Sequence, residues 1–468
     1  MPQKCRSSPL SPKSSPTKKI KWLIIGAGPT GIGAAHRLSK LSENDFLVLE
    51  KSNQIGGLAT SYRDDKGFVW DIGGHVQFSH YEYFDQAMLE ALPKEQWYHH
   101  QRESWVWIKE RFVPYPFQNN IHRLDPADCQ NCLQGLRDKN KKRGPENFKE
   151  WLSQSFGEEL CRIFMHPYNY KVWAYYPEEL SYSWIGERVA EVDLEKIEQN
   201  IKLSRDDVSW GPNSTFQFPK LGGTGAIWQG LADKIGQNQF QLQTCVEKID
   251  SQKKLAYTDS GVIEYQHLLS TMPLDLFCQK IEGLPSTTIE TAKKLKHSSS
   301  HIFGIGLEGK LPAQLEGKCW MYFPEENCPF YRVTVFSHYS PQNVPGENYF
   351  SLMAEVSESP QKPVDKQKLM DQVIEGLQKT KLIDLKKQQI VSKWQFHAAY
   401  GYPTPSLERD QILNSVQPEL EKRQLFSRGR FGAWKYEVSN QDHSFMQGVE
   451  WVDQMVHNKK EKTYYGID

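Results

Sequence analysis

A glycine-rich turn near the N-terminus has the residue types and the spacing of a pyrophosphate-binding loop. Gly26-Ala27-Gly28-Pro29-Thr30-Gly31 lies between the apolar run Trp22-Leu23-Ile24-Ile25 and the helical pattern Ile32 to Leu41. The first glycine allows a tight turn, the second lets the backbone approach a phosphate, and the helix N-terminus supplies free N–H groups. Glu50 lies 24 residues beyond Gly26, where its carboxylate can accept hydrogen bonds from ribose hydroxyls. This order predicts a dinucleotide-binding βαβ unit.

Two further glycine clusters bear on which dinucleotide binds. Ile55-Gly56-Gly57-Leu58-Ala59 follows Glu50 closely and resembles the paired glycines of FAD-binding flavoproteins of the amine-oxidase and mutase superfamily. This resemblance favours FAD over NAD. Gly222-Gly223-Thr224-Gly225 precedes a helical segment and is a further glycine-rich approach to the cofactor. Val246 lies on a predicted strand, where its backbone is expected to contact adenine.

The rest of the chain must supply the elements that hold a ligand against this unit. Residues 123–206 have a helical and charged pattern. Between residues 261 and 359, short segments alternate as strands do: His301 to Leu307, Tyr331 to Phe336 and Tyr349 to Val356. An amphipathic helix is predicted over Val364 to Gln378, and a last helix from near His443 past Met455.

These patterns predict an α/β fold, with a Rossmann-type FAD-binding domain, a helical domain and an antiparallel β-sheet domain. Residues 1–20 are rich in Ser, Pro and Lys and are expected to be a disordered tail. We expect the FAD-binding domain to combine residues 21–100, 219–262 and 415–468, and the helical domain to span residues 121–212. The sheet domain, which is expected to bind the substrate, combines residues 101–120, 213–218 and 263–414.

Charge and composition exclude several classes of partner. The 57 basic and 57 acidic residues cancel, so the chain lacks the positive field that nucleic-acid binders use. No apolar stretch approaches about 18 residues, and no secretory signal is visible. The sequence therefore predicts a cytoplasmic protein with no membrane span. Cys129 and Cys132 form a CxxC motif without a second ligand pair, so we predict no metal site there or elsewhere.

Longer motifs carry a more specific resemblance. Asp71-Ile72-Gly73-Gly74-His75-Val76, together with Phe78-Ser79-His80-Tyr81, looks like the flavin-contacting loop of eukaryotic-type UDP-galactopyranose mutases. Further blocks that resemble this family, in the family's order, are Val113 to Asn120, Pro167 to Trp173, Trp184 to Ala190, Cys319 to Arg332, Gly401 to Pro405 and Ser427 to Ser444. The resemblance extends from about residue 20 to about residue 455, which is almost the whole chain beyond the tail.

The resemblance implies an activity and its cofactors. Enzymes of this family interconvert UDP-galactopyranose and UDP-galactofuranose, an isomerisation without net redox change. They require reduced FAD, because the flavin attacks the anomeric carbon of the sugar, expels UDP and forms a covalent adduct. The resemblance also implies that NADPH reduces the flavin and that UDP-galactose is the substrate. It leaves the oligomeric state open.

The departing UDP is a multiply charged anion, and guanidinium groups suit its phosphate oxygens better than ammonium groups do. Arg188 and Arg332 are the candidates for this role, and with His75 they form the predicted catalytic group. By resemblance, Tyr322, Tyr402 and Tyr436 add hydroxyl donors to the pyrophosphate, and Trp320 is a further substrate-binding residue. The residues that resemble the uridine-binding group are Tyr115, Gln118, Phe164, Asn169, Trp173 and Asn213.

The same resemblance assigns residues to the two cofactors. Around the flavin these are Gly73, Gly74, His75, Arg430, Asn440, Gln441 and Ser444, in addition to the glycine clusters described above. His75 is expected to lie against the flavin, without acting as a general base. Phe78, Arg102 and Ser104 resemble positions near bound NADPH.

Two other functions are compatible with a nucleotide-binding fold. A redox flavoenzyme of the amine-oxidase or protoporphyrinogen-oxidase type shares the fold and passes electrons from FAD to oxygen. Such an oxidase needs an apolar cage, however, whereas this chain offers paired arginines and tyrosines. A catalytically idle nucleotide-sugar-binding protein is the second alternative. The intact glycine turns and flavin loop argue against it.

Overall fold

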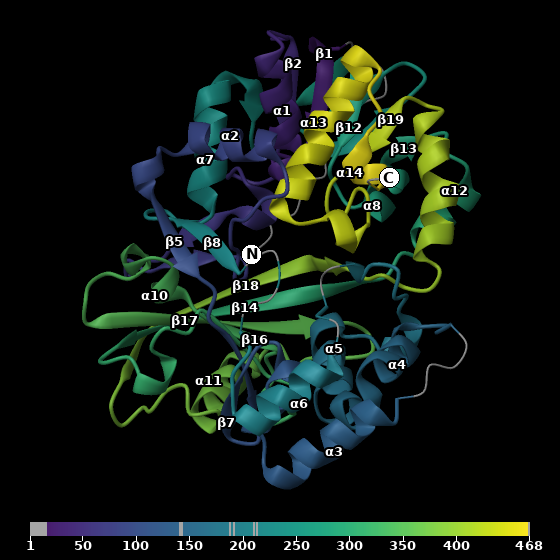
Figure 1. The fold of residues 1–468 in the computed structure, drawn as a ribbon. Helices are drawn as coiled ribbons and strands as arrows, with labels where there is room; N and C mark the ends of the chain where they lie inside the picture. Colours follow the sequence, from purple (N-terminus) through teal and green to yellow (C-terminus); the bar gives the residue numbers. More distant parts are fainter. Residues whose placement is uncertain are drawn as a thin grey trace.

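The computed structural model describes residues 16–139, 144–186, 189–190, 192–208, 211 and 214–466. The nucleotide-binding sheet and its helices form the upper half of the view in Figure 1, and a second sheet crosses the middle. Helices α3 to α6 lie below this second sheet. Within the described ranges, no helix combines the length and the apolar character that crossing a membrane requires.

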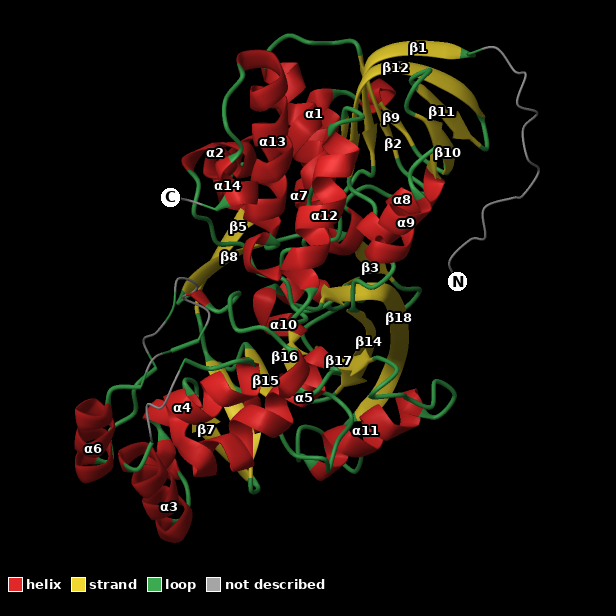
Figure 2. Ribbon diagram, turned by 90° about the vertical axis from the view of Figure 1, so that its right-hand side faces the viewer, coloured by secondary structure: helices red, strands yellow, loops and turns green. Residues whose placement is uncertain are grey.

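In the described part of the chain, the nucleotide-binding sheet has eight strands, in the order β13-β10-β11-β12-β1-β2-β9, with β19 paired to β12. Strand β1 (Lys18–Ile25) runs parallel to β2 (Phe46–Leu49) and to β12 (Gly261–Ser270). Figure 2 shows these strands fanning out beside the helices. The remaining strands are β9 (Phe240–Gln241), β10 (Val246–Asp250), β11 (Leu255–Thr258), β13 (Ile281–Glu282) and β19 (Leu425–Ser427).

The predicted βαβ unit is confirmed, with one correction at its start. Strand β2 ends directly before Glu50 and is the second strand of this unit, and α1 (Pro29–Lys40) covers most of the predicted helix Ile32 to Leu41. Residues 18–20, which we expected in the disordered tail, belong to β1, where they pair with residues 263–265 of β12. The prediction was wrong there because the charged side chains of Lys18 and Lys19 are typical of a solvated tail. The backbone of an exposed strand end can nevertheless pair with its neighbour.

Helix α13 (Gln441–His457) packs against α1 at unusually close range. A Cβ on Gly33 would lie 2.1 Å from the Phe445 carbonyl oxygen, and one on Gly448 would lie 2.0 Å from that of Thr30. The predicted last helix is therefore present, but a short helix, α14 (Lys462–Tyr465), follows it. Other helices beside this sheet are α2 (Glu82–Ala91), α7 (Gly225–Ile235), α8 (Leu274–Lys280), α9 (Ser286–Ala292) and α12 (Arg409–Glu421).

The second sheet has the strand order β18-β14-β17-β16-β15-β6-β7 among the described residues. All its neighbours are antiparallel except β15 and β6, which run parallel. The bounds are β6 (Ser104–Ile108), β7 (Arg111–Pro114), β14 (His297–Glu308), β15 (Trp320–Tyr322), β16 (Arg332–Val335), β17 (Tyr349–Glu358) and β18 (Gln389–Pro403). Helix α11 (Leu369–Lys379) lies beneath it and begins five residues later than predicted.

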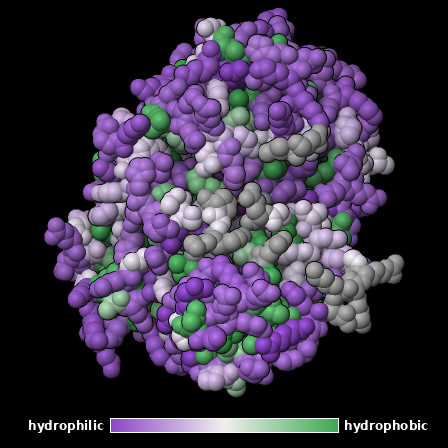
Figure 3. Space-filling model, viewed as in Figure 1, coloured by the Kyte–Doolittle hydropathy of each residue, from purple (hydrophilic) through white to green (hydrophobic). Residues whose placement is uncertain are grey.

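The helical region comprises α3 (Pro126–Arg137), α4 (Phe148–Leu160), α5 (His166–Trp173) and α6 (Leu194–Leu203), with a π-helical turn at Cys161–Met165 before α5. Two small sheets complete the framework: β3 (Ser61–Arg63) with β4 (Val69–Asp71), and β5 (Trp97–Gln101) with β8 (Thr215–Pro219). The short helix α10 (Phe336–Tyr339) follows β16. The predicted fold class, a Rossmann-type domain with helices and a largely antiparallel sheet, is confirmed. On the face in Figure 3, hydrophobic residues are scattered among hydrophilic ones.

Candidate active site

The glycine turn after β1 has the geometry of a phosphate-binding loop. Gly26 has a φ of +103°, and a Cβ there would lie 2.1 Å from Thr271 Oγ1. A Cβ on Gly31 would lie 1.9 Å from the carbonyl oxygen of Gly26. Gly28 is the N-cap of α1 and provides no side-chain cap, so the first N–H groups of the helix can serve a ligand. These steric limits explain the glycines at positions 26 and 31.

Glu50 and the second glycine pair come together with this turn. The Glu50 carboxylate accepts hydrogen bonds from the backbone N–H groups of Ala27 and Ser52, both at 2.9 Å. The Gly56 N–H donates to the Ala27 carbonyl at 2.8 Å. A Cβ on Gly57 would lie 3.2 Å from the Cα of Gly28. The structure thus places Gly28, Gly57, Leu58 and Glu50 around one loop, as a dinucleotide site requires.

The third glycine cluster holds a buried carboxylate. The Thr224 hydroxyl donates to Asp71 at 2.6 Å, and the Ser61 hydroxyl donates to the same carboxylate. A Cβ on Gly223 would lie 2.5 Å from Asp71 Oδ1, which leaves no room for a side chain. Burial raises the pKa of Asp71 to about 6. Asp71 therefore anchors the start of the loop at residues 71–76 through Thr224 and Ser61, a role that the sequence analysis missed.

A second buried carboxylate, Glu355 on β17, binds that loop from the other side. It accepts a hydrogen bond from the Gly74 N–H at 3.1 Å and from the Tyr331 hydroxyl at 2.8 Å. Arg332 on β16 donates to it through Nε at 2.7 Å and Nη2 at 2.8 Å. Burial would raise the pKa of Glu355, but the Arg332 charge and these donors outweigh it and lower the pKa. Glu355 is therefore an ionised bridge between the loop and Arg332.

His75 follows Gly74 in the same loop. Its backbone N–H donates to the Gly73 carbonyl at 2.9 Å. Burial lowers the pKa of His75 to about 4, although the Glu355 charge opposes this shift. Within the described residues, His75 Nδ1 and Thr334 Oγ1 are buried without a hydrogen-bond partner. A Cβ on Gly74 would lie 2.5 Å from that hydroxyl oxygen.

Aromatic side chains from five separate segments of the chain line the region beside Arg332. The ring centroids of Tyr115 and Tyr168 each lie 5.3 Å from that of Tyr322. Trp173 packs edge-on against Tyr402 at 5.9 Å and against Tyr436 at 4.8 Å. Residues predicted to bind uridine and pyrophosphate therefore lie together.

Burial raises the pKa of Tyr115, Tyr322 and Tyr402, so these hydroxyls are neutral near pH 7 and can donate hydrogen bonds. The Trp320 indole N–H donates to the Tyr322 hydroxyl at 2.6 Å. Trp320 thus orients one of the predicted donors.

Phe164 is buried between two other aromatic rings. Its ring centroid lies 4.7 Å from that of Phe117 and 5.3 Å from that of Tyr168.

The predicted amides have local partners. The Gln118 amide donates to the Ala190 carbonyl at 3.0 Å, and the Asn169 amide donates to the Met165 carbonyl at 2.8 Å. The latter bond links α5 to the last residue of the π-helical turn before it. Arg188 and Asn213 lie outside the described residues.

Arg430 and the start of α13, which were predicted to contact the flavin, form hydrogen bonds with neighbouring segments. The Arg430 guanidinium donates to the Gly401 carbonyl at 3.0 Å and to the Ser439 hydroxyl at 2.9 Å, 5.0 Å from the centre of the Tyr402 ring. Asn440 is the N-cap of α13 without a side-chain cap bond. Gln441 accepts a hydrogen bond from Trp228 at 3.1 Å, and Ser444 is buried one turn later. Val246, which was predicted to contact adenine, is buried at the start of β10.

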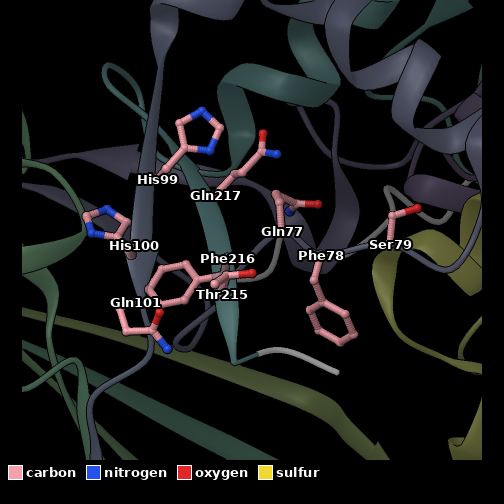
Figure 4. Close-up of a pocket in the computed structure, with 9 residues that line it drawn as sticks. All are labelled: Gln77, Phe78, Ser79, His99, His100, Gln101, Thr215, Phe216 and Gln217. Carbon is pink, nitrogen blue, oxygen red and sulfur yellow. The ribbon is translucent and has the colours of Figure 1, made fainter. Parts of the chain in front are cut away.

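A cavity of about 580 Å³ lies next to the end of the 71–76 loop. Figure 4 shows Phe78 pointing into it, with the strands β5 and β8 behind. The lining residues are Gln77, Phe78, Ser79, His99, His100, Gln101, Thr215, Phe216 and Gln217. Of the predicted NADPH residues, Phe78 lines this cavity, while Arg102 and Ser104 are buried just beyond β5. Arg102 lies over the Tyr115 ring, at 5.7 Å from its centroid.

The sequence analysis assigned no role to Asp71, Tyr168, Tyr331 or Glu355. Tyr168 and Asp71 lie inside motifs that we had singled out, so their proximity to the site was accessible from sequence. Glu355 carried no such signal. It becomes visible only through the strand register, which sets Arg332 directly opposite Glu355.

The chain matches the model of the flavin-containing amine oxidoreductase family over residues 29–442. Among curated proteins, a ferredoxin–NADP reductase of Acholeplasma laidlawii is 38% identical over 71 residues, which are 15% of this chain and 21% of that protein. The chain thus spans about a fifth of the length of this relative.

Solved structures extend the comparison over the whole fold. A putative protoporphyrinogen oxidase from Exiguobacterium sp. 255-15 is 15% identical with a TM-score of 0.71, covering 95% of this chain and 99% of that one. This likeness shows the fold alone. A reduced UDP-galactopyranose mutase is 46% identical with a TM-score of 0.92, covering 96% of both chains. The chain therefore belongs to the flavin-containing amine oxidoreductase family and, within it, to the UDP-galactopyranose mutases.

Proposed function

We propose that this protein interconverts UDP-galactopyranose and UDP-galactofuranose with reduced FAD as its cofactor. The observation that carries the proposal is the ion pair of Arg332 and Glu355, at 2.7 and 2.8 Å, which is joined directly to the loop at Gly74. It fixes a cation for a phosphate group next to the predicted flavin position. The neutral tyrosines around it suit the rest of a nucleotide sugar.

The residues present fit an FAD molecule. The Gly26–Gly31 turn offers free N–H groups to the pyrophosphate, and the Glu50 carboxylate is fixed by two backbone donors where ribose is expected. At the other end, His75 Nδ1 and Thr334 Oγ1 are polar atoms without a partner in the described residues, as a site for a polar ring system would require. When bound and reduced, FAD supplies the nucleophile for the anomeric carbon of the sugar.

Arg332 binds and orients the departing UDP. Nε and Nη2 are engaged by Glu355, and Nη1 has no hydrogen-bond partner among the described residues. Nη1 is therefore available to a phosphate oxygen. Glu355 prevents the guanidinium from rotating, so the charge is oriented before substrate binds. Tyr322 and Tyr402 contribute neutral donors, while Tyr115, Phe164 and Trp173 provide apolar faces for uracil.

We further propose that NADPH reduces the flavin from the cavity beside Phe78. This cavity adjoins the 71–76 loop, and its mixed aromatic and amide lining suits a nicotinamide nucleotide. The role is a proposal that rests on the resemblance of Phe78, Arg102 and Ser104 to positions near NADPH.

An amine-oxidase-like activity is the alternative. Oxidases of this fold need an apolar substrate cage, and the ionised Arg332–Glu355 pair would be costly to bury beside a neutral amine substrate. A pyrophosphate gives this pair a partner. The site therefore favours the mutase reaction.

The experiment that tests the function is chromatography of UDP-galactofuranose incubated with the purified, FAD-loaded protein. We expect conversion to UDP-galactopyranose after dithionite reduction and none with oxidised flavin, without peroxide release. Peroxide production with an amine substrate would favour the oxidase function instead. Failure of the reduced enzyme to convert the sugar would favour the oxidase or the idle binding protein.

Arg332→Ala is expected to weaken UDP binding roughly tenfold or more, because it removes a charge-assisted contact of about 1.5–3 kcal/mol. Isothermal titration calorimetry of UDP with the oxidised holoprotein measures this loss, and the flavin absorbance verifies that FAD stays bound. Arg137→Ala is the matched control, since Arg137 is in an exposed ion pair with Glu198. Equal UDP affinities in both variants would remove Arg332 from the site.

The low pKa of His75 predicts that its imidazole remains neutral across the working pH range. Because the folded pKa of about 4 lies below the unfolded value of 6.5, the neutral form contributes stability above pH 6.5, and this is lost as pH falls toward 4. Histidine 13Cε1 NMR, with His75→Gln to assign the signal, should show no titration of His75 between about pH 5.5 and 8. A midpoint inside that window would contradict the neutral assignment.

A further inference from the structure

A second cluster of ionisable side chains lies on the largely antiparallel sheet, away from the site described above. His301 on β14, Glu358 at the end of β17 and His397 on β18 come from three neighbouring strands. Cross-strand pairing sets His301 directly opposite His397. Glu355 and Glu358 are three residues apart on β17, so their side chains leave opposite faces of the sheet. The cluster is therefore distinct from the proposed active site.

The three side chains converge on one point. His301 Nε2 lies 2.8 Å from Glu358 Oε2, and His397 Nε2 lies 3.8 Å from the same oxygen. One donor atom from each residue falls within 4.8 Å of the other two. The imidazole rings are stacked, with centroids 4.4 Å apart, and the exposed His397 ring is the one that can turn so that both nitrogens point at a shared ion. The Ser299 hydroxyl, 3.2 Å from Oε2, helps to orient that carboxylate.

We infer that His301, Glu358 and His397 form a binding site for one divalent transition-metal ion of borderline softness, such as Zn²⁺. Two imidazoles and one carboxylate are a set of protein ligands that zinc accepts, with water completing the tetrahedron. Zinc bonds of about 2.0–2.1 Å place tetrahedral ligand atoms about 3.3 Å apart. His397 is 42% exposed and on an edge strand, so its side chain can close the remaining distance.

The surroundings of the site contain competing cations as well as ligand atoms. The Nε2 atoms of His301 and His397 both face Glu358 Oε2, and a neutral imidazole offers such a nitrogen to a metal. Two lysines compete with a metal. The Lys366 ammonium lies 3.1 Å from Glu358 Oε2, but its side chain is 56% exposed and can move into solvent. The Lys362 ammonium donates to the Ser357 carbonyl at 2.7 Å. Metal binding would exchange the Lys366 ion pair and the His301–Glu358 hydrogen bond for three coordinate bonds.

A second trio, His80, Asp442 and His443, also brings one donor atom from each residue within 4.8 Å of the other two, but its carboxylate is shared differently. His80 Nδ1 faces Asp442 Oδ2 at 2.7 Å, whereas His443 Nδ1 faces Oδ1 at 3.1 Å. The carboxylate thus divides its two oxygens between the imidazoles as a hydrogen-bonded bridge. In the His301 cluster, by contrast, one oxygen faces both rings.

The test is a Zn²⁺ titration of chelator-treated holoprotein, followed by competition with a chromophoric chelator near neutral pH. We expect one tight site per chain and a zinc-dependent rise in the melting temperature. His397→Ala and Glu358→Gln should each weaken binding roughly tenfold or more, as loss of even an outer-shell partner can. Lys366→Gln should tighten binding, because it removes the competing charge.

Two controls make the result specific. His457→Ala changes an exposed histidine outside both clusters and should leave zinc binding unchanged. His80→Ala tests the other trio. The proposal is overturned if the wild type binds no stoichiometric zinc, if binding follows His80 instead, or if Glu358→Gln leaves affinity unchanged. If Glu358→Gln leaves the zinc affinity unchanged, the two histidines alone bind the ion and the proposed three-ligand site is wrong.

Discussion

Glu355 accepts hydrogen bonds from two parts of the chain that lie far apart in the sequence, at residue 74 and at residues 331–332. One donor is the Gly74 N–H, in the loop at residues 71–76, and the others are Arg332 and Tyr331 beside β16. A buried carboxylate needs such donors to remain ionised. Four such hydrogen bonds keep Glu355 charged, and two of them hold the Arg332 guanidinium in place. The loop at residues 71–76 and the Arg332 guanidinium are thus fixed by the same side chain.

The rest of the framework serves this arrangement. Asp71 anchors the start of the loop through Thr224 and Ser61. The loop is therefore held at Asp71 and at Gly74 by two buried carboxylates whose pKa values shift in opposite directions. The pKa of Asp71 is raised because burial dominates. The pKa of Glu355 is lowered because the Arg332 charge and the other donors outweigh burial. Only the second carboxylate lies next to a fixed positive charge, which is the charge that a pyrophosphate needs.

Local patterns predicted the parts of this structure that depend on near neighbours in sequence. The strand–turn–helix around Gly26 to Gly31, strand β2 and the position of Glu50 follow from hydrophobic runs and steric demands on glycine. Motif resemblance placed Arg332 and the aromatic residues in one site. The ends of strands were harder to predict. Residues 18–20 belong to β1 although Lys18 and Lys19 are charged, because pairing with β12 and not residue propensity determines the structure there.

Pairing across strands could not be predicted, since no local signal fixes register in an antiparallel sheet. The register of β16 on β17 sets Glu355 opposite Arg332, and that of β14 on β18 sets His301 opposite His397. Both clusters therefore escaped the sequence analysis, which found the strand segments but not their partners. The expectation of no metal site considered cysteine spacing, and histidines from different strands have no spacing to recognise.

The measurement that tests the central role of Glu355 most directly is a paired determination in Glu355→Gln, with calorimetric UDP affinity and flavin midpoint potential recorded on the same holoprotein. Glu282→Gln, which changes an exposed ion pair with Lys248, is the reference. If Glu355 fixes both sides of the site, UDP affinity falls roughly tenfold and the potential shifts, while Glu282→Gln changes neither. A folded Glu355→Gln protein with wild-type affinity and potential would contradict the account.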